Sequence, residues 1–199
     1  MPELNHPTWK IAGRTMAATP PDNWREQLAA RLGHRPRRIG LLAELALYGA
    51  LDCLASAHET TLPKNDVLRV CSLHGPTSAI SQVLNENQEY LPMPFSFLQS
   101  QTSQILPALA AALNWQGDAC VVLARNAMHL ATLAAHQAGN NGMLLGWVEE
   151  GQTCQSFWLR LVPCAASATN FVSAASFEEM ISPDTRYWRC ARAGMEISF

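Results

Sequence analysis

The stretch from residue 117 to residue 150 constrains the fold most strongly, because three regular elements follow one another there without a linker. Residues 119–123 form a short apolar run with two valines, which is typical of a buried strand. Residues 127–138 are mostly apolar and almost uncharged, so we predict a helix that is buried on most faces. Residues 143–148 form a second apolar run. Strand, helix and strand within about thirty residues predict a βαβ unit.

The boundaries of this unit carry their own signals. Asn126 can act as the N-cap of the helix, because its side-chain oxygen can accept from the free N–H groups of the first turn. Residues 139–142, Gly-Asn-Asn-Gly, end the helix, since both residue types tolerate the left-handed backbone conformation. We expect Glu149 and Glu150 to lead the chain back to the surface.

The composition is that of a globular protein with one domain. The chain has 199 residues, 48% of them hydrophobic and 15% charged, with a net charge of −2, so it is long enough to bury a sizeable core. This balance excludes a disordered chain and argues against non-specific nucleic-acid binding. No run approaches the roughly 20 apolar residues of a membrane span, and the N-terminus lacks an apolar signal core, so we expect a cytoplasmic protein.

The cysteines do not predict a metal site. Six are present, without a C-x-x-C pair and without a Cys/His cluster at zinc-ligand spacing. Cys53, Cys71 and Cys120 lie inside apolar segments, where cysteine behaves as a small hydrophobic residue. We therefore predict reduced, structural thiols. The glycine-rich dinucleotide and phosphate-loop motifs are also absent, and we expect no cofactor.

The remaining elements are predicted from apolar periodicity and from capping or turn residues. We expect strands at 67–73 and 155–162, an edge strand at 9–13, a last strand at 187–197, an extended segment at 91–95, a loop or irregular segment at 164–176, and helices at 24–32, 39–58, 79–87, 100–113 and 177–181.

A basic segment precedes the second of these helices. Arg35, Arg37 and Arg38 give three cations within four residues. One interpretation is a solvated helix start, although cations at a helix N-terminus oppose the helix dipole. The other interpretation is a docking surface for an acidic partner.

Several motifs resemble the N-terminal half of β-ketoacyl synthases. The 117–150 unit is similar to their nucleophile unit, with the strand ACVVL, the helix NAMHLATLAAHQ, the turn AGNNG and the strand MLLGWVEE. Upstream, RRIGLLAELALYGAL, VLRVCSLHG and PMPFSFLQSQTSQILPALAAAL resemble further motifs of the ketosynthase-like N-terminal family, in the family's order. The resemblance covers residues 24–162 and is nearest to chain-length-factor proteins of aryl-polyene-type and other type II polyketide pathways. It implies an α/β, thiolase-like half with a mixed five-stranded sheet and helices on both faces.

The same resemblance implies a protein without ketosynthase catalysis. The position of the nucleophilic cysteine falls at Ala124 or Arg125, neither of which can be acylated, and Cys120 lies about one turn too early. The family's two catalytic histidines belong to a C-terminal half that this chain does not reach. His129 and His136 lie on the apolar helix, where we expect core or boundary roles. An arginine buried at position 125 requires a carboxylate or several carbonyls around it.

Four other residues are assigned to a remnant pocket of the old active site: His74, Phe95, Ser96 and Asn126. His74 follows a strand and precedes a Gly-Pro turn, a position where site residues often lie. Because no acid or nucleophile is adjacent to it in sequence, we expect a structural role for it.

A lone half of a ketosynthase exposes apolar surface that a partner has to cover. We therefore expect pairing with a full-length ketosynthase, binding of an acyl carrier protein, or a homodimer. The acidic surface of a carrier protein suits the basic segment at Arg35, Arg37 and Arg38. The alternative is an independent small acyltransferase or hydrolase, with a nucleophile at Cys120 or at a serine, for which no G-x-S-x-G elbow is present. The candidate nucleophilic serines are Ser72, Ser96 and Ser100.

Overall fold

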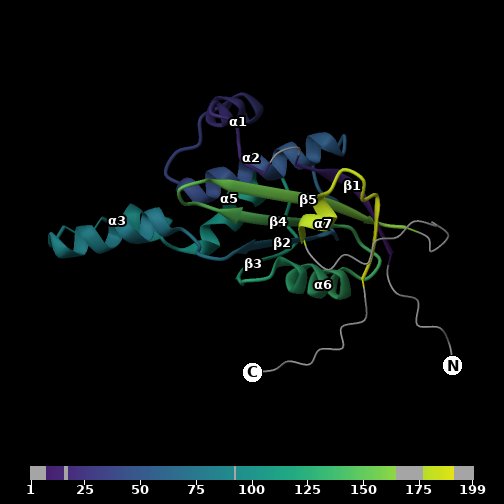
Figure 1. The fold of residues 1–199 in the computed structure, drawn as a ribbon. Coiled ribbons are helices and arrows are strands. Elements are labelled where there is room, and N and C mark those ends of the chain that lie inside the picture. Colours follow the sequence, from purple (N-terminus) through teal and green to yellow (C-terminus); the bar gives the residue numbers. More distant parts are fainter. Residues whose placement is uncertain (1–7, 16–17, 92, 165–176, 191–199) are drawn as a thin grey trace, which may run out of the picture.

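The computed structural model describes residues 8–15, 18–91, 93–164 and 177–190, which form one mixed sheet with helices on both faces (Figure 1). The elements are β1 (Thr8–Arg14), α1 (Trp24–Leu32), α2 (Leu41–Ser56), β2 (Val67–Ser72), α3 (Thr77–Gln88), α4 (Pro94–Gln99), the 3₁₀ turn η1 (Thr102–Gln104), α5 (Ile105–Ala112), β3 (Asp118–Leu123), α6 (Ala127–Ala138), β4 (Met143–Glu149), β5 (Gln155–Pro163), α7 (Phe177–Ile181) and β6 (Tyr187–Arg189).

The strand order of the sheet is β3-β2-β4-β5-β1-β6. β3, β2 and β4 run parallel to one another, whereas β4, β5, β1 and β6 form antiparallel pairs. The predicted βαβ unit is confirmed as β3-α6-β4, and its crossover passes over β2, which lies between the two strands. β3 is consequently an edge strand.

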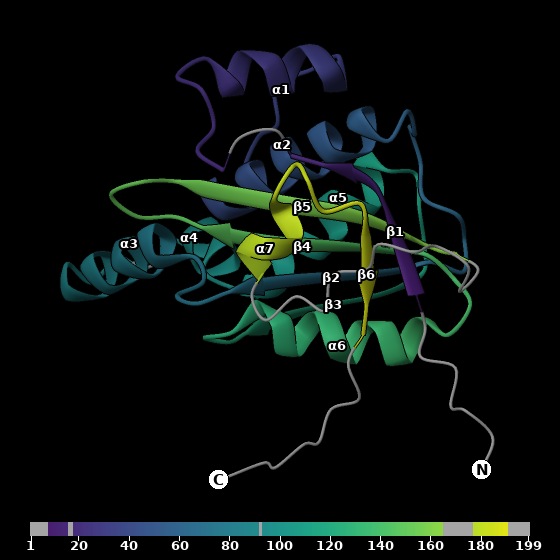
Figure 2. The ribbon, with the colours of Figure 1, turned by 45° about the vertical axis from the view of Figure 1, so that its right-hand side comes forward.

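Each face of the sheet has its own hydrophobic core. α2 and α5 cover one face, with α1 packed on the outer side of α2, and α6 covers the other face together with α7 (Figure 2). α2 contributes ten buried residues from its sixteen, as its nearly uncharged sequence predicts. α6 buries a row of five alanines, which lets this helix lie close to the strands.

The strand β2, which lies between the edge strand β3 and β4, contains one charged residue, and it is fully paired. Arg69 is 2% exposed. Its guanidinium donates to the carboxylate of Asp118 at 2.5 Å and to Gln137 Oε1 at 2.8 Å. A buried arginine is tolerated when such partners satisfy its donors. In this position it also ties the edge strand β3 and the helix α6 to the centre of the sheet.

The sequence predictions of the fold need four corrections. The sheet has six strands rather than five, because the three-residue strand β6 pairs with β1. β1 is therefore an interior strand and not the predicted edge strand. The segment predicted as extended at 91–95 enters helix α4, which begins at Pro94, a residue well suited to the first turn of a helix. The helix predicted at 100–113 is divided into η1 and α5.

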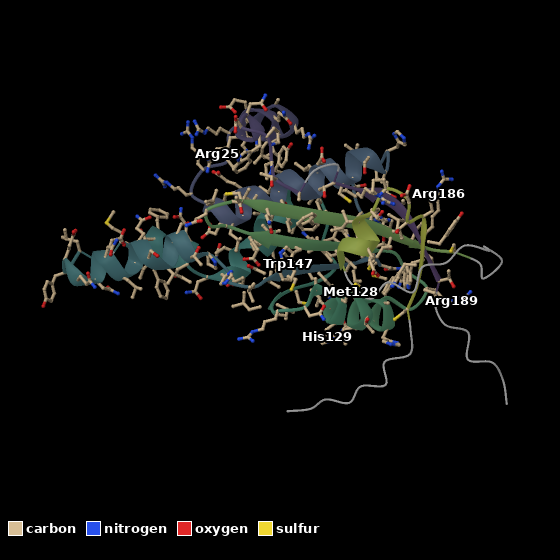
Figure 3. The ribbon with its side chains drawn as sticks, in the orientation of Figure 1. Arg25, Met128, His129, Trp147, Arg186 and Arg189 are labelled. Atoms are coloured by element: carbon tan, nitrogen blue, oxygen red, sulfur yellow. The ribbon has the colours of Figure 1, made fainter. Side chains whose placement is uncertain are left out.

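Helix α6 has the predicted bounds but is not buried on most of its surface. His129, Leu133, His136 and Gln137 are exposed on its outer side, and Figure 3 shows His129 on this helix below the sheet. Of the core or boundary roles expected of His129 and His136, the core role does not apply, because one helix packed on a sheet buries only one side. Most of the loop predicted at 164–176, and the end of the strand predicted at 187–197, lie outside the described residues.

Candidate functional site

The junction between β3 and α6 is the place where a ketosynthase nucleophile is expected. Ala124 is partly buried, and its N–H donates to the carbonyl of Ser72 at 2.9 Å, which prolongs the pairing of β3 with β2. Asn126 is the N-cap of α6, as predicted, with its Oδ1 accepting from Met128 N at 2.9 Å. Arg125 is exposed, so it does not need the partners that a buried arginine requires. Neither of the two positions assigned to the nucleophile, Ala124 and Arg125, carries the thiol that acyl transfer in ketosynthases needs.

The thiols near this junction are poor nucleophiles. None of the six cysteines forms a disulfide bond with a described residue, and burial raises the pKa of Cys71 to about 11. Burial also raises the pKa of Cys120, although Arg69 acts in the opposite direction. Because the thiolate is the reactive form, neither residue is activated at neutral pH. Within the described residues, no three His, Cys, Asp or Glu side chains are grouped so as to hold a metal ion.

The four residues assigned to a remnant pocket make separate sets of contacts. His74 is exposed at the end of β2, with its Nδ1 3.4 Å from Glu149. Phe95 lies under the guanidinium of Arg38, whose carbon is 4.6 Å from the ring centroid. Ser96 is buried against α3, and Asn126 caps α6. No hydrogen bond or ring contact joins any two of these four side chains in the part of the chain that is described.

The basic segment at the start of α2 is a free cationic surface. Arg35, Arg37 and Arg38 are exposed and form no ion pair with any described residue. Arg38 has a positive φ of 63°, which is uncommon for a residue with a side chain. Its guanidinium nevertheless stacks on Phe95, so the basic segment and α4 meet at this contact.

Among the described residues, most of the exposed large apolar side chains lie on one projection, which the sequence did not predict. We call residues 77–99 the arm; it contains α3 and α4, and α3 extends away from the sheet in Figure 1. Seven large apolar residues of the arm are between 40% and 64% exposed, and Tyr90 is 90% exposed. The seven are Ile80, Leu84, Leu91, Met93, Phe95, Phe97 and Leu98. Such a surface marks an interaction site.

A polar cluster holds the two helices of the arm together. Glu86 Oε1 accepts from Ser96 Oγ at 2.6 Å and from Gln82 Nε2 at 2.9 Å, and Oε2 accepts from Met93 N at 3.2 Å. The hydrogen bond from Ser96 lowers the pKa of Glu86, and those from Gln82 and Met93 act in the same direction. The arm therefore has a defined shape before any partner binds.

The edge strand β3 ends beside the arm. A Cβ placed on Gly75, in the turn before α3, would lie 3.4 Å from the Leu123 side chain. Because Ala124 N–H points to β2, alternation directs the N–H groups of Ala119, Val121 and Leu123 toward the open edge. Residues 119–123 contain no proline and no charged side chain, the features that would discourage pairing with a further strand.

Comparison with solved structures identifies the fold. The chain is similar to the ishigamide ketosynthase/chain length factor (TM-score 0.59, 11% identity, 79% of this chain and 59% of that chain). It is also similar to the ketosynthase ApeO in complex with its chain length factor ApeC from Xenorhabdus doucetiae (TM-score 0.55, 16% identity, 79% of this chain and 78% of that chain). A third similar structure is AntDE:AntF, a type II polyketide synthase acyl-carrier protein in complex with its ketosynthase (TM-score 0.61, 11% identity, 79% of this chain and 62% of that chain).

These likenesses define a ketosynthase-like domain with a thiolase-like fold, as the sequence motifs imply. More narrowly, two of the three structures contain a chain length factor by their descriptions. The chain spans less than two thirds of two of the matched chains. No family model and no curated protein sequence matches it. No described helix is long and apolar enough to cross a membrane.

Proposed function

We propose that this protein is a non-catalytic, ketosynthase-like accessory subunit of fatty acid or polyketide biosynthesis, acting in the cytoplasm and paired with a full-length ketosynthase. The observation that carries the proposal is the apolar arm beside an unprotected edge strand. A partner protein can bury this apolar surface by adding a strand to β3 and by packing against the arm. An aryl-polyene-type pathway is the setting that the sequence motifs favour.

Two further observations support an accessory role. The position that the motifs match to the family's nucleophile falls at Ala124 or Arg125, neither of which is a thiol, and burial raises the pKa of Cys120. In addition, the match with the ketosynthase–chain length factor complex covers 79% of this chain and 78% of the other, so the two matched chains are of similar length. A ketosynthase-like chain of this size therefore occurs within a ketosynthase complex.

A proline on the open edge of β3 tests the pairing. Val121→Pro removes an N–H that points away from β2, so the internal sheet keeps its hydrogen bonds while an incoming strand loses one. We expect the variant to fold and to lose most of the ketosynthase that the wild-type protein retains in a tagged pull-down from the native cell, read by mass spectrometry.

Val121→Ala is the matched control, because it removes the same side-chain packing and keeps the N–H. Retention of the ketosynthase by both variants would exclude strand addition at β3. Recovery of the wild-type chain alone, as a stable homodimer, would replace the proposed ketosynthase partner by a second copy of this chain.

We further propose that the basic segment receives the acyl carrier protein of the same pathway. Its three arginines have no ion-pair partner among the described residues and are free to meet an acidic surface. Reversing all three charges (Arg35→Glu, Arg37→Glu, Arg38→Glu) is expected to abolish binding of the purified carrier protein in a titration at low salt. Unchanged affinity, in a variant that still captures the ketosynthase, would contradict carrier docking here.

A further inference from the structure

The arm is connected to the body of the protein at both ends, through the turn between β2 and α3 and through the passage from α4 into η1, and two carboxylates hold the first of these connections. Glu149 is the last residue of β4 and Glu150 follows it directly. Their neighbour in the sheet is β2, so the end of β4 lies beside the start of the turn at Leu73. Both side chains are engaged with residues 73–78 rather than with solvent.

Glu149 binds the backbone of the turn itself. Its carboxylate accepts from the N–H groups of Leu73 and His74, the latter at 3.3 Å, and its side chain is only 12% exposed. The next amide, Gly75 N, donates to Ser72 Oγ at 2.9 Å. Three successive N–H groups of the turn are therefore bound by side chains at the end of the sheet, which fixes where the arm begins.

Glu150 replaces the missing cap of α3. The N-cap position of this helix is Pro76, which has no capping side chain. Glu150 Oε1 accepts instead from Ser78 N at 2.7 Å and from Ser78 Oγ at 2.9 Å, although it lies 72 residues away in sequence. Free N–H groups in the first turn of a helix require such an acceptor, and a carboxylate there also interacts favourably with the helix dipole.

The same carboxylate faces a second helix start. Glu150 is 4% exposed, and its Oε2 has no hydrogen-bond partner among the described residues. It lines a small cavity of about 10 Å³ together with residues 39–43, where α2 begins at an N-cap, Gly40, that also lacks a capping side chain. The negative charge thus lies between the N-termini of α3 and α2, both of which favour an anion.

We infer that Glu149 and Glu150 are positioning residues for the partner interface: they fix the direction of the arm relative to the sheet, so that the apolar face of the arm and the edge of β3 form one surface. This inference rests on the proposed function for its purpose, but the contacts and their effect on the arm do not depend on any partner. Without the two carboxylates, the start of α3 loosens at the 73–76 turn, within the limits set by the connection of α4 to η1 and by the contact of Phe95 with Arg38, while the sheet and its two cores remain folded.

Amide hydrogen exchange by NMR tests the inference on the full chain. In Glu150→Gln, which is isosteric and uncharged, we expect the Ser78 amide to exchange at least ten times faster, with amides of β2 and β4 unchanged. Glu150→Asp keeps the charge between the two helix starts and should restore part of the protection. Glu89→Gln removes a carboxylate from the exposed end of the same arm and is the matched control.

Two results would overturn the inference. One is an unchanged Ser78 amide in Glu150→Gln, or a change shared equally by the whole sheet. The other is faster exchange without any loss of ketosynthase capture relative to Glu89→Gln, since the direction of the arm would then be irrelevant to binding. Failure of the wild-type protein to capture a ketosynthase would count against the proposed function instead, and the exchange result would still decide whether Glu150 holds the arm.

Discussion

Phe97→Ala is expected to weaken binding of the partner ketosynthase by about thirtyfold or more. Phe97 lies on α4 and is 59% exposed, so the isolated protein gains little stability from its ring. Buried in an interface, an aromatic anchor of this kind contributes about 2 kcal/mol or more when truncated to alanine, and each 1.4 kcal/mol is about tenfold in affinity. Titration of the purified ketosynthase with the two forms measures the difference.

Leu133→Ala is the control for this substitution. Leu133 is 51% exposed, comparable with Phe97, but it lies on the outer side of α6 rather than on the arm. Its loss should leave the affinity within a factor of about two, because isolated exposed apolar residues are ordinary on protein surfaces. Equal losses in the two variants would show that the arm is no more important to binding than α6.

Helix α6 and the strands around it were predictable because their signals are local. The alanine-rich run, the cap at Asn126 and the glycine-containing turn lie within one segment, and the observed helix has the predicted bounds. The position of β3 at the edge was not predictable, since it depends on a crossover that passes over β2. β6 lies within the last strand predicted at 187–197, but its pairing with β1, which makes β1 an interior strand, joins residues far apart in sequence and was not predictable.

The arm shows why an interface is difficult to read from sequence. Ile80 and Leu84 are four residues apart on α3, a spacing that predicts one apolar face but does not say what covers it. In the structure this face is exposed rather than packed on the sheet. The prediction for Glu150 failed in the opposite direction, since this residue was expected at the surface but is 4% exposed. Its hydrogen-bond partner Ser78 is distant in sequence, so the contact could not be predicted from the neighbouring residues.

The largest loss of stability is expected at Trp158, where the helix α2 and the strand β4 meet the same ring. Trp158 is fully buried, and its Nε1 donates to Ser156 Oγ at 3.0 Å. That hydroxyl donates in turn to the carbonyl of Leu45 in α2 at 2.8 Å. Trp158→Ala removes the ring and leaves a cavity, so we expect the free energy of unfolding to fall by about 3–5 kcal/mol in chemical denaturation.

The effect of Gly49→Ala on stability tests how closely the surrounding residues pack against the Trp158 ring. Alanine improves helix propensity by about 1 kcal/mol, but a Cβ at this position of α2 would overlap Ser156 Oγ and the Trp158 ring. A Cβ added to Gly146 on β4 would likewise lie 2.6 Å from the six-membered ring of Trp158, so the side chain is closely packed against this strand as well. Overpacking costs about 1–3 kcal/mol and should outweigh propensity in the wild type. In the Trp158→Ala background the overlap with the ring is gone and only the overlap with Ser156 Oγ remains, so Gly49→Ala should cost less stability there than in the wild type. Additive effects of the two substitutions would mean that the two sites are not coupled through the ring.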